Sequence, residues 1–69
     1  MTIQEKCIHL VTILGYNSRQ LGNVLEVSQQ TADKKIKLIE RNKFTEKDFE
    51  KLCQFIDNLN LEIIKLKLL

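Results

Sequence analysis

Residues that start helices recur along this chain, and three of them are followed three positions later by a residue that can complete a capping box. The pairs are Thr2 with Glu5, Asn17 with Gln20, and Thr45 with Asp48. Ser28 is a fourth candidate cap, because it stands directly before an apolar periodic segment. The chain contains no proline, so nothing forces a break inside the segments that follow these residues. The pattern predicts a mainly α-helical domain.

Apolar residues follow each start signal at the three- and four-residue spacing of an amphipathic helix. Four helices are predicted, over residues 3–14, from the Asn17 cap to about residue 25, from the Ser28 cap to about residue 39, and over 45–58. Gly15 fits the left-handed residue that ends the first helix. Gly22 lies inside the second helix, where it costs about 1 kcal/mol relative to alanine. We therefore expect the backbone of another helix to pass close to Gly22.

The last nine residues, 61–69, fit two structures. Apolar residues and lysines alternate strictly from Ile64 to Leu68, which is the period of a β-strand. Leucine, lysine and glutamate nevertheless prefer helices, so a short fifth helix capped by Asn60 competes with the strand. In either form Ile64, Leu66 and Leu68 are predicted to hold two copies together, a strand by pairing across a two-fold axis. The predicted organisation is a domain at 1–58 and a dimerisation segment at 59–69.

Composition argues against several classes of function. Cys7, Cys53 and His9 are the only residues of their kinds and cannot supply the four ligands of a structural zinc site. Both cysteines fall on apolar stripes, so we expect reduced, buried thiols and a cytoplasmic protein. The sequence holds no phosphate-cradling glycine loop, metal motif or nucleophile–base pair. We expect no enzyme, cofactor, metal or small-molecule ligand, and no membrane partner, because no apolar run reaches membrane-spanning length.

Positive charge is concentrated in one part of the chain. The net charge is only +2, so a nucleic-acid interface must depend on where the charges lie. Five of the basic residues fall within ten positions, and they are Lys34, Lys35, Lys37, Arg41 and Lys43. This cluster fits a surface that contacts phosphates.

The segments S-R-Q-L-G-N-V-L and V-S-Q-Q-T-A, between Ser18 and Ala32, carry a resemblance to a known family. They resemble the helix-turn-helix of phage repressors and Cro proteins, which have the lambda-repressor-like fold. The likeness covers residues 3–58, with the specific motif confined to about 18–36. It implies a four-helix DNA-binding domain whose third helix enters the major groove. Two positions depart from the family, since Glu26 replaces the usual turn glycine and Lys35 replaces a frequent aromatic residue.

The resemblance also implies which residues would contact DNA. Base contacts fall on Gln29, Gln30 and Lys34, and the chemistry is suitable, because glutamine can bond adenine through two hydrogen bonds and lysine can donate to guanine. Phosphate contacts are implied for Asn17, Ser18, Thr31, Lys37, Arg41, Asn42 and Lys43.

The sequence supports two alternative functions, one a DNA-binding protein and the other a protein-binding protein. The first is a sequence-specific transcriptional regulator, a Cro- or repressor-like homodimer on a palindromic operator in double-stranded DNA. The alternative is a protein-binding phage antirepressor or inhibitor that uses the same fold. The low net charge and Glu26 favour this alternative. A third and weaker hypothesis is an excisionase-like architectural protein that bends DNA.

Overall fold

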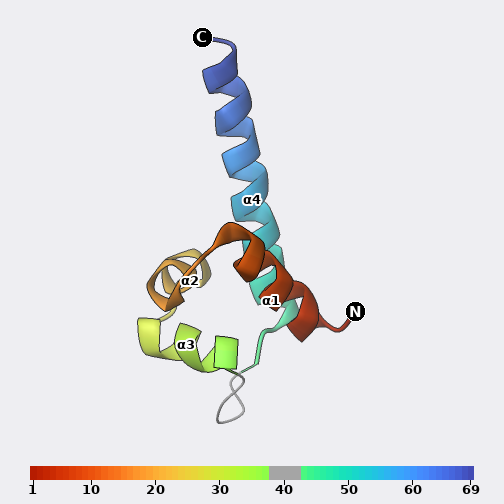
Figure 1. Cartoon of the computed structure of the whole chain (residues 1–69), viewed down its shortest axis with the longest axis vertical. Helices are drawn as coiled ribbons and strands as arrows, with labels where there is room; N and C mark the ends of the chain where they lie inside the picture. The colour runs from red at the N-terminus through yellow and green to blue at the C-terminus, as the bar shows by residue number, and fades with distance from the viewer. Residues whose placement is uncertain (38–42) are drawn as a thin grey trace.

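The computed structural model describes residues 1–37 and 43–69, and this part of the chain forms four helices (Figure 1). In chain order they are α1 (Ile3–Leu14), α2 (Ser18–Leu25), α3 (Gln29–Lys37) and α4 (Glu46–Lys67). The prediction of a mainly α-helical chain is confirmed. The predicted end of the third helix at residue 39 lies outside the described residues.

The sequence signals that start three of these helices act as predicted. The Thr2 hydroxyl accepts a hydrogen bond from the backbone N–H of Glu5 at 3.2 Å, and the Glu5 carboxylate accepts one from the N–H of Thr2 at 3.1 Å. Asn17 and Thr45 form the same reciprocal pairs with the residues three positions on. Gly15 ends α1 with a φ of +67°, in the left-handed region. Each cap satisfies backbone donors that a helix terminus leaves without an intrahelical partner.

The turn between α2 and α3 is tight because Gly22 has no side chain. A Cβ at position 22 would lie 2.9 Å from the carbonyl oxygen of Val27, closer than real Cβ contacts. The same turn contains Glu26 with a φ of +61°, the only non-glycine residue with positive φ in the described chain. A close approach at Gly22 is thus confirmed, but the prediction that another helix makes it is wrong, because the approaching backbone belongs to Val27 and Ser28 in the turn.

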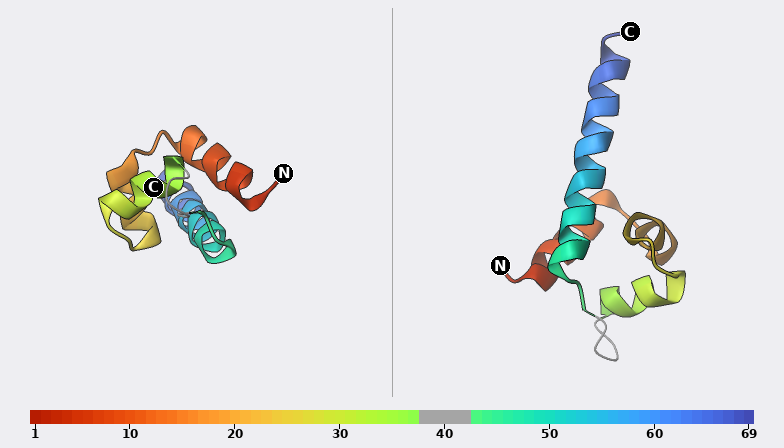
Figure 2. Two further views of the ribbon diagram at one scale, coloured as in Figure 1. Left: turned by 90° about the horizontal axis from the view of Figure 1, so that it is seen from below. Right: turned by 180° about the vertical axis from the view of Figure 1, so that it is seen from behind.

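The core lies where α1 and α2 pack against α4, and α3 is attached to it through α2 (Figure 2). Leu21, Leu25, Leu52 and Cys7 are the largest fully buried side chains. The prediction of a buried thiol is confirmed for Cys7, whereas Cys53 is half-buried. Burial, followed by the nearby Asp48 and Cys53, raises the pKa of the Cys7 thiol to about 11.

Polar side chains tie the helices together at the edges of this core. Lys51 of α4 donates to the carbonyl oxygen of Leu25 at 3.1 Å, which caps the carboxyl end of α2. Gln4 of α1 donates to the carbonyl oxygen of Phe44 and accepts a hydrogen bond from the N–H of the same residue. The backbone before α4 is therefore held by α1, and the buried Phe44 ring is fixed in the core.

The predicted C-terminal strand is wrong, and so is the separate fifth helix. Residues 61–67 belong to α4, a single helix of 22 residues in which Asn60 is an interior position. Extending an existing helix needs no new nucleus, whereas a strand would need a partner to pair with. Because the segment is helical, the predicted dimerisation residues do not share a face: Ile64 and Leu68 lie on one side and Leu66 on another.

The second half of α4 projects beyond the other helices, and the described chain extends 47 Å along its longest axis (Figure 1). Every side chain from Asp57 to Leu69 is exposed, and seven of the exposed ones are leucine or isoleucine. Even so, no helix in the described ranges is both long and apolar enough to cross a membrane.

Candidate functional site

The polar face of α3 is the surface on which the predicted base-contacting residues lie. Ala32 is fully buried and anchors α3 against the core. Gln29 and Gln30 are exposed at the start of the helix. Together with Ser18 and Asp33 they line a shallow depression of about 490 Å³. The two glutamines thus reach solvent from a fixed helix, beside the first turn of α2.

The start of α3 is capped as the sequence predicted for Ser28. The Ser28 hydroxyl oxygen accepts a hydrogen bond from the backbone N–H of Thr31 at 3.1 Å, and it donates to the Thr31 hydroxyl at 2.9 Å. This arrangement orients the first turn of α3, which carries both glutamines. Thr31, predicted to contact phosphate, is half-buried and has its hydroxyl engaged by the cap.

Asp33 is a member of this site that the sequence reading missed. Its carboxylate accepts a hydrogen bond from the Ser18 hydroxyl at 2.9 Å and forms an ion pair with Lys37 at 3.0 Å. The Lys37 ammonium, and then the Ser18 hydroxyl, hold the pKa of Asp33 below its ordinary value. The four-residue spacing of Asp33 and Lys37 on one helix was the available signal. Two predicted phosphate contacts, Ser18 and Lys37, therefore converge on one acid.

The basic residues of the cluster are divided between surface and interior. Lys37 and Lys43 are exposed, while Lys34 is half-buried. Lys35 is directed inward: its ammonium lies 2.8 Å from the Asp48 carboxylate and donates to the Lys43 carbonyl oxygen at 3.0 Å. Its inclusion among the phosphate-facing charges is wrong, because an ion pair and a backbone acceptor hold it away from the surface.

Of the remaining predicted phosphate contacts, only some lie in the part of the chain that the structure describes. Asn17 is exposed next to Ser18, and its side-chain oxygen accepts the N–H of Gln20 at 2.9 Å as the cap of α2. Arg41 and Asn42 lie outside the described residues. The structure therefore brings Asn17, Ser18 and the α3 face together.

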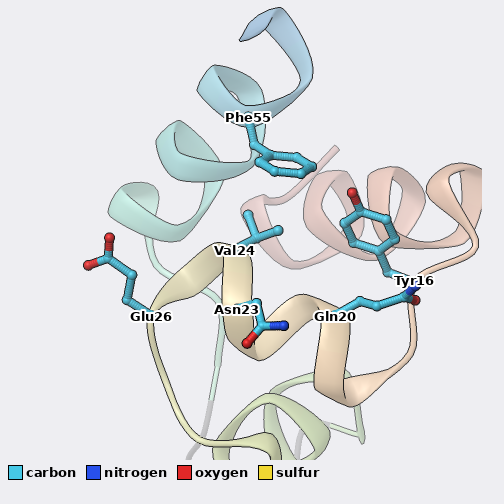
Figure 3. Close-up of a pocket in the computed structure, with 6 residues that line it drawn as sticks. All are labelled: Tyr16, Gln20, Asn23, Val24, Glu26 and Phe55. Carbon is cyan, nitrogen blue, oxygen red and sulfur yellow. The ribbon is translucent and has the colours of Figure 1, made fainter. Parts of the chain in front are cut away.

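A second depression, of about 400 Å³, lies between α2 and α4 (Figure 3). Its lining residues are Tyr16, Gln20, Asn23, Val24, Glu26 and Phe55. The rings of Tyr16 and Phe55 meet edge to face with their centres 6.0 Å apart. In residues 1–37 and 43–69, no three His, Cys, Asp or Glu side chains are grouped to hold a metal ion. The α3 face remains the stronger candidate, because it gathers several polar side chains on rigid helices.

No protein-family model matches this chain, and searches of curated proteins and of solved structures found no significant match.

Proposed function

We propose that this chain is a sequence-specific DNA-binding regulator that binds a palindromic operator as a homodimer and represses transcription by occupying a promoter. The observation that carries the proposal is the α3 face: a short helix, fixed by a cap and a tight turn, presents two exposed glutamines beside the start of another helix. A helix-turn-helix uses its second helix in this way in the major groove.

In this proposal the roles follow from chemistry and position. Gln29, Gln30 and Lys34 contact base edges, where an amide can both donate to and accept from adenine. The start of α2, with Asn17 and Ser18, contacts the phosphates, since helix N-termini carry free N–H groups and a positive dipole end. Lys37 contacts a phosphate after leaving Asp33, an exchange that its exposed position allows.

The first test is selection of bound sequences from a random pool of DNA duplexes. Enrichment of a palindromic sequence supports the proposal and its stoichiometry, and absence of any enrichment contradicts it. Gln30→Ala is expected to weaken operator binding by about 1–3 kcal/mol and to relax the preference at one base position. Asn23→Ala, which truncates an exposed amide on α2 outside the proposed contacts, is the matched control and should change neither.

A second candidate is a protein-binding inhibitor, and the exposed apolar side chains of the projecting part of α4 favour it. Apolar patches of this kind often mark protein interaction sites. Salt dependence separates the two functions. Binding to DNA weakens steeply between low and physiological salt because counterions are released, whereas an apolar contact with a protein changes little.

A further inference from the structure

The projecting part of α4 carries apolar side chains on two opposite sides, because an α-helix turns by about 100° per residue. One row, the inner stripe, consists of Leu59, Ile63 and Leu66. The other row, the outer stripe, consists of Leu61, Ile64 and Leu68. Exposed fractions in the two rows range from 39% to 82%. A helix that is apolar on both sides is typical of one that is covered by other elements.

The two stripes differ in what lies below them on α4. The inner stripe continues the face that includes the fully buried Leu52, seven residues before Leu59, and α1 and α2 pack on that face. The outer stripe continues a face that carries Glu50, Gln54 and Asp57, which are all exposed. The outer stripe is therefore on the side of α4 that the rest of the molecule leaves open.

We propose that the outer stripe binds the outer stripe of a second copy of this chain, with the two α4 helices parallel. Leu61, Ile64 and Leu68 are spaced three and four residues apart, which is the seam of a two-stranded coiled coil. An identical helix supplies the complementary seam by two-fold symmetry.

Charge favours the parallel orientation. An antiparallel pair centred on Ile64 places Lys65 of one copy beside Lys65 of the other, and like charges in contact are unfavourable. In a parallel pair Asn60 lies opposite Lys65 of the second copy. The ammonium group of Lys65 lies 3.6 Å from the Glu62 carboxylate of its own helix, and because this pair is largely exposed, the ammonium group can also donate to the Asn60 amide oxygen. A parallel pair through the inner stripe is disfavoured, because α1 and α2 pack lower on the same face of α4 and the two bodies would collide there.

Parallel pairing of α4 would explain how the proposed regulator binds two half-sites, and this part of the inference rests on the proposed function. α3 lies at the end of the molecule opposite the C-terminus (Figure 2). Parallel pairing at the tips of α4 thus directs both α3 helices the same way, as a palindromic operator requires. Glu50, Gln54 and Asp57 keep the lower halves of the two α4 helices solvated, so the two bodies sit apart.

The size of the contact determines its strength. Three apolar side chains from each copy make a contact smaller than the roughly 1,200 Å² of total buried surface that is the lower end for stable interfaces. Pairing is therefore concentration-dependent in free solution, and operator binding strengthens it because the second half-site is then bound intramolecularly.

Ile63 and Ile64 provide a matched test, since they are adjacent, have exposed fractions of 47% and 53%, and belong to different stripes. Sedimentation equilibrium across a concentration series should show self-association for the wild-type chain and for Ile63→Lys. Ile64→Lys should weaken self-association at least ten-fold. A monomeric wild type at all concentrations, or a larger loss with Ile63→Lys, overturns the proposal.

Disulfide trapping tests the orientation without DNA. Under mild oxidation, Leu68→Cys should form a covalent dimer faster than Ile63→Cys does, because only parallel pairing brings the two positions 68 together. The wild-type chain, with its own Cys7 and Cys53, gives the background rate. An antiparallel pair centred on Ile64 places position 68 beside position 60 of the other copy and yields no such dimer. A trapped parallel dimer that selects no DNA sequence contradicts the proposed function while leaving this inference standing.

Discussion

The ammonium group of Lys35 and the carboxylate of Asp48 lie 2.8 Å apart, with only 12% and 10% of their side chains exposed. This ion pair joins α3 to the first turn of α4. Asp48 also accepts the N–H of Thr45 at 2.9 Å as part of the capping box. The Asp48 carboxylate thus caps the start of α4 and also holds α3, the helix that carries the candidate site, in position.

Lys35→Met should destabilise the fold by about 3 kcal/mol, because it leaves the Asp48 carboxylate buried without its partner charge. Lys37→Met removes a pair that is largely exposed, so its effect should stay below about 1 kcal/mol. Urea unfolding followed by circular dichroism measures both. Equal losses for the two variants would show that the Lys35 pair is no stronger than a surface pair.

Acid should destabilise the protein partly through Asp48. Burial alone would raise the pKa of this carboxyl group, but hydrogen bonds from Lys35 and Thr45 outweigh burial and hold the pKa below its ordinary value of 3.8. A group with a lowered folded-state pKa contributes stability above the ordinary value and loses it as the pH falls through the folded-state value. Asp48→Asn should therefore be less stable at neutral pH and lose less stability below pH 3.8. If the free energy of unfolding fell by the same amount with decreasing pH in both proteins, the prediction would be contradicted.

Gly22→Ala should destabilise the protein although alanine is the better helix former by about 1 kcal/mol. Its Cβ would meet the Val27 carbonyl oxygen at 2.9 Å, and the turn backbone must shift to admit it. Thermal unfolding measures the loss, and chemical shifts of Gln29 and Gln30 report whether α3 moves. Asn23→Ala, at an exposed position of the same helix, is the control and should be near neutral.

Cys7 should resist thiol reagents in the folded protein. Its side chain is fully buried, and burial is the main cause that raises the pKa of the thiol to about 11, so little thiolate forms near neutral pH. Mass spectrometry after timed alkylation should find Cys53 modified first, because it is only half-buried. Unfolding in urea should equalise the two rates, and early modification of Cys7 in the folded protein would count against the core described above.

Asp33→Asn should strengthen DNA binding several-fold if α3 lies in the major groove. The change removes a negative charge from the α3 face and releases Lys37 from its ion pair, which leaves the lysine for a phosphate. Titration of operator DNA at two salt concentrations measures the gain. Measured on a single half-site, where pairing through α4 does not contribute, Glu62→Gln removes an acid from the projecting part of α4 and should leave the affinity unchanged.

Local signals explain why much of this fold was predictable from sequence. A cap and its partner three residues on determine a helix start by themselves, so the helix starts predicted at Thr2, Asn17 and Thr45 are confirmed. The strand predicted from the alternation between Ile64 and Leu68 is wrong, because five residues with two opposite apolar rows fit a strand and a two-sided helix equally well. The exposed positions of Gln29 and Gln30 followed from the cap at Ser28.

Other features depend on tertiary packing, which no local pattern encodes. Lys35 and Lys37 look alike in sequence, yet one pairs with Asp48 inside the structure and the other with Asp33 at the surface. Helical spacing places Lys35, three residues after the buried Ala32, on the inner side of α3, but the identity of its partner, Asp48, depends on where α4 begins relative to α3. The role of Asp33 also required the position of Ser18, fifteen residues earlier.

The two hydrogen bonds between the Gln4 side chain and the backbone of Phe44 constrain the order in which this protein folds as it is synthesised. The two residues are forty positions apart, so the first helix has no final binding site until residue 44 has left the ribosome. The pair of α2 and α3 consists of short-range contacts and can form early. The core closes only when Leu52 emerges, and each nascent chain must keep Cys7, Leu21 and Leu25 from other contacts until then.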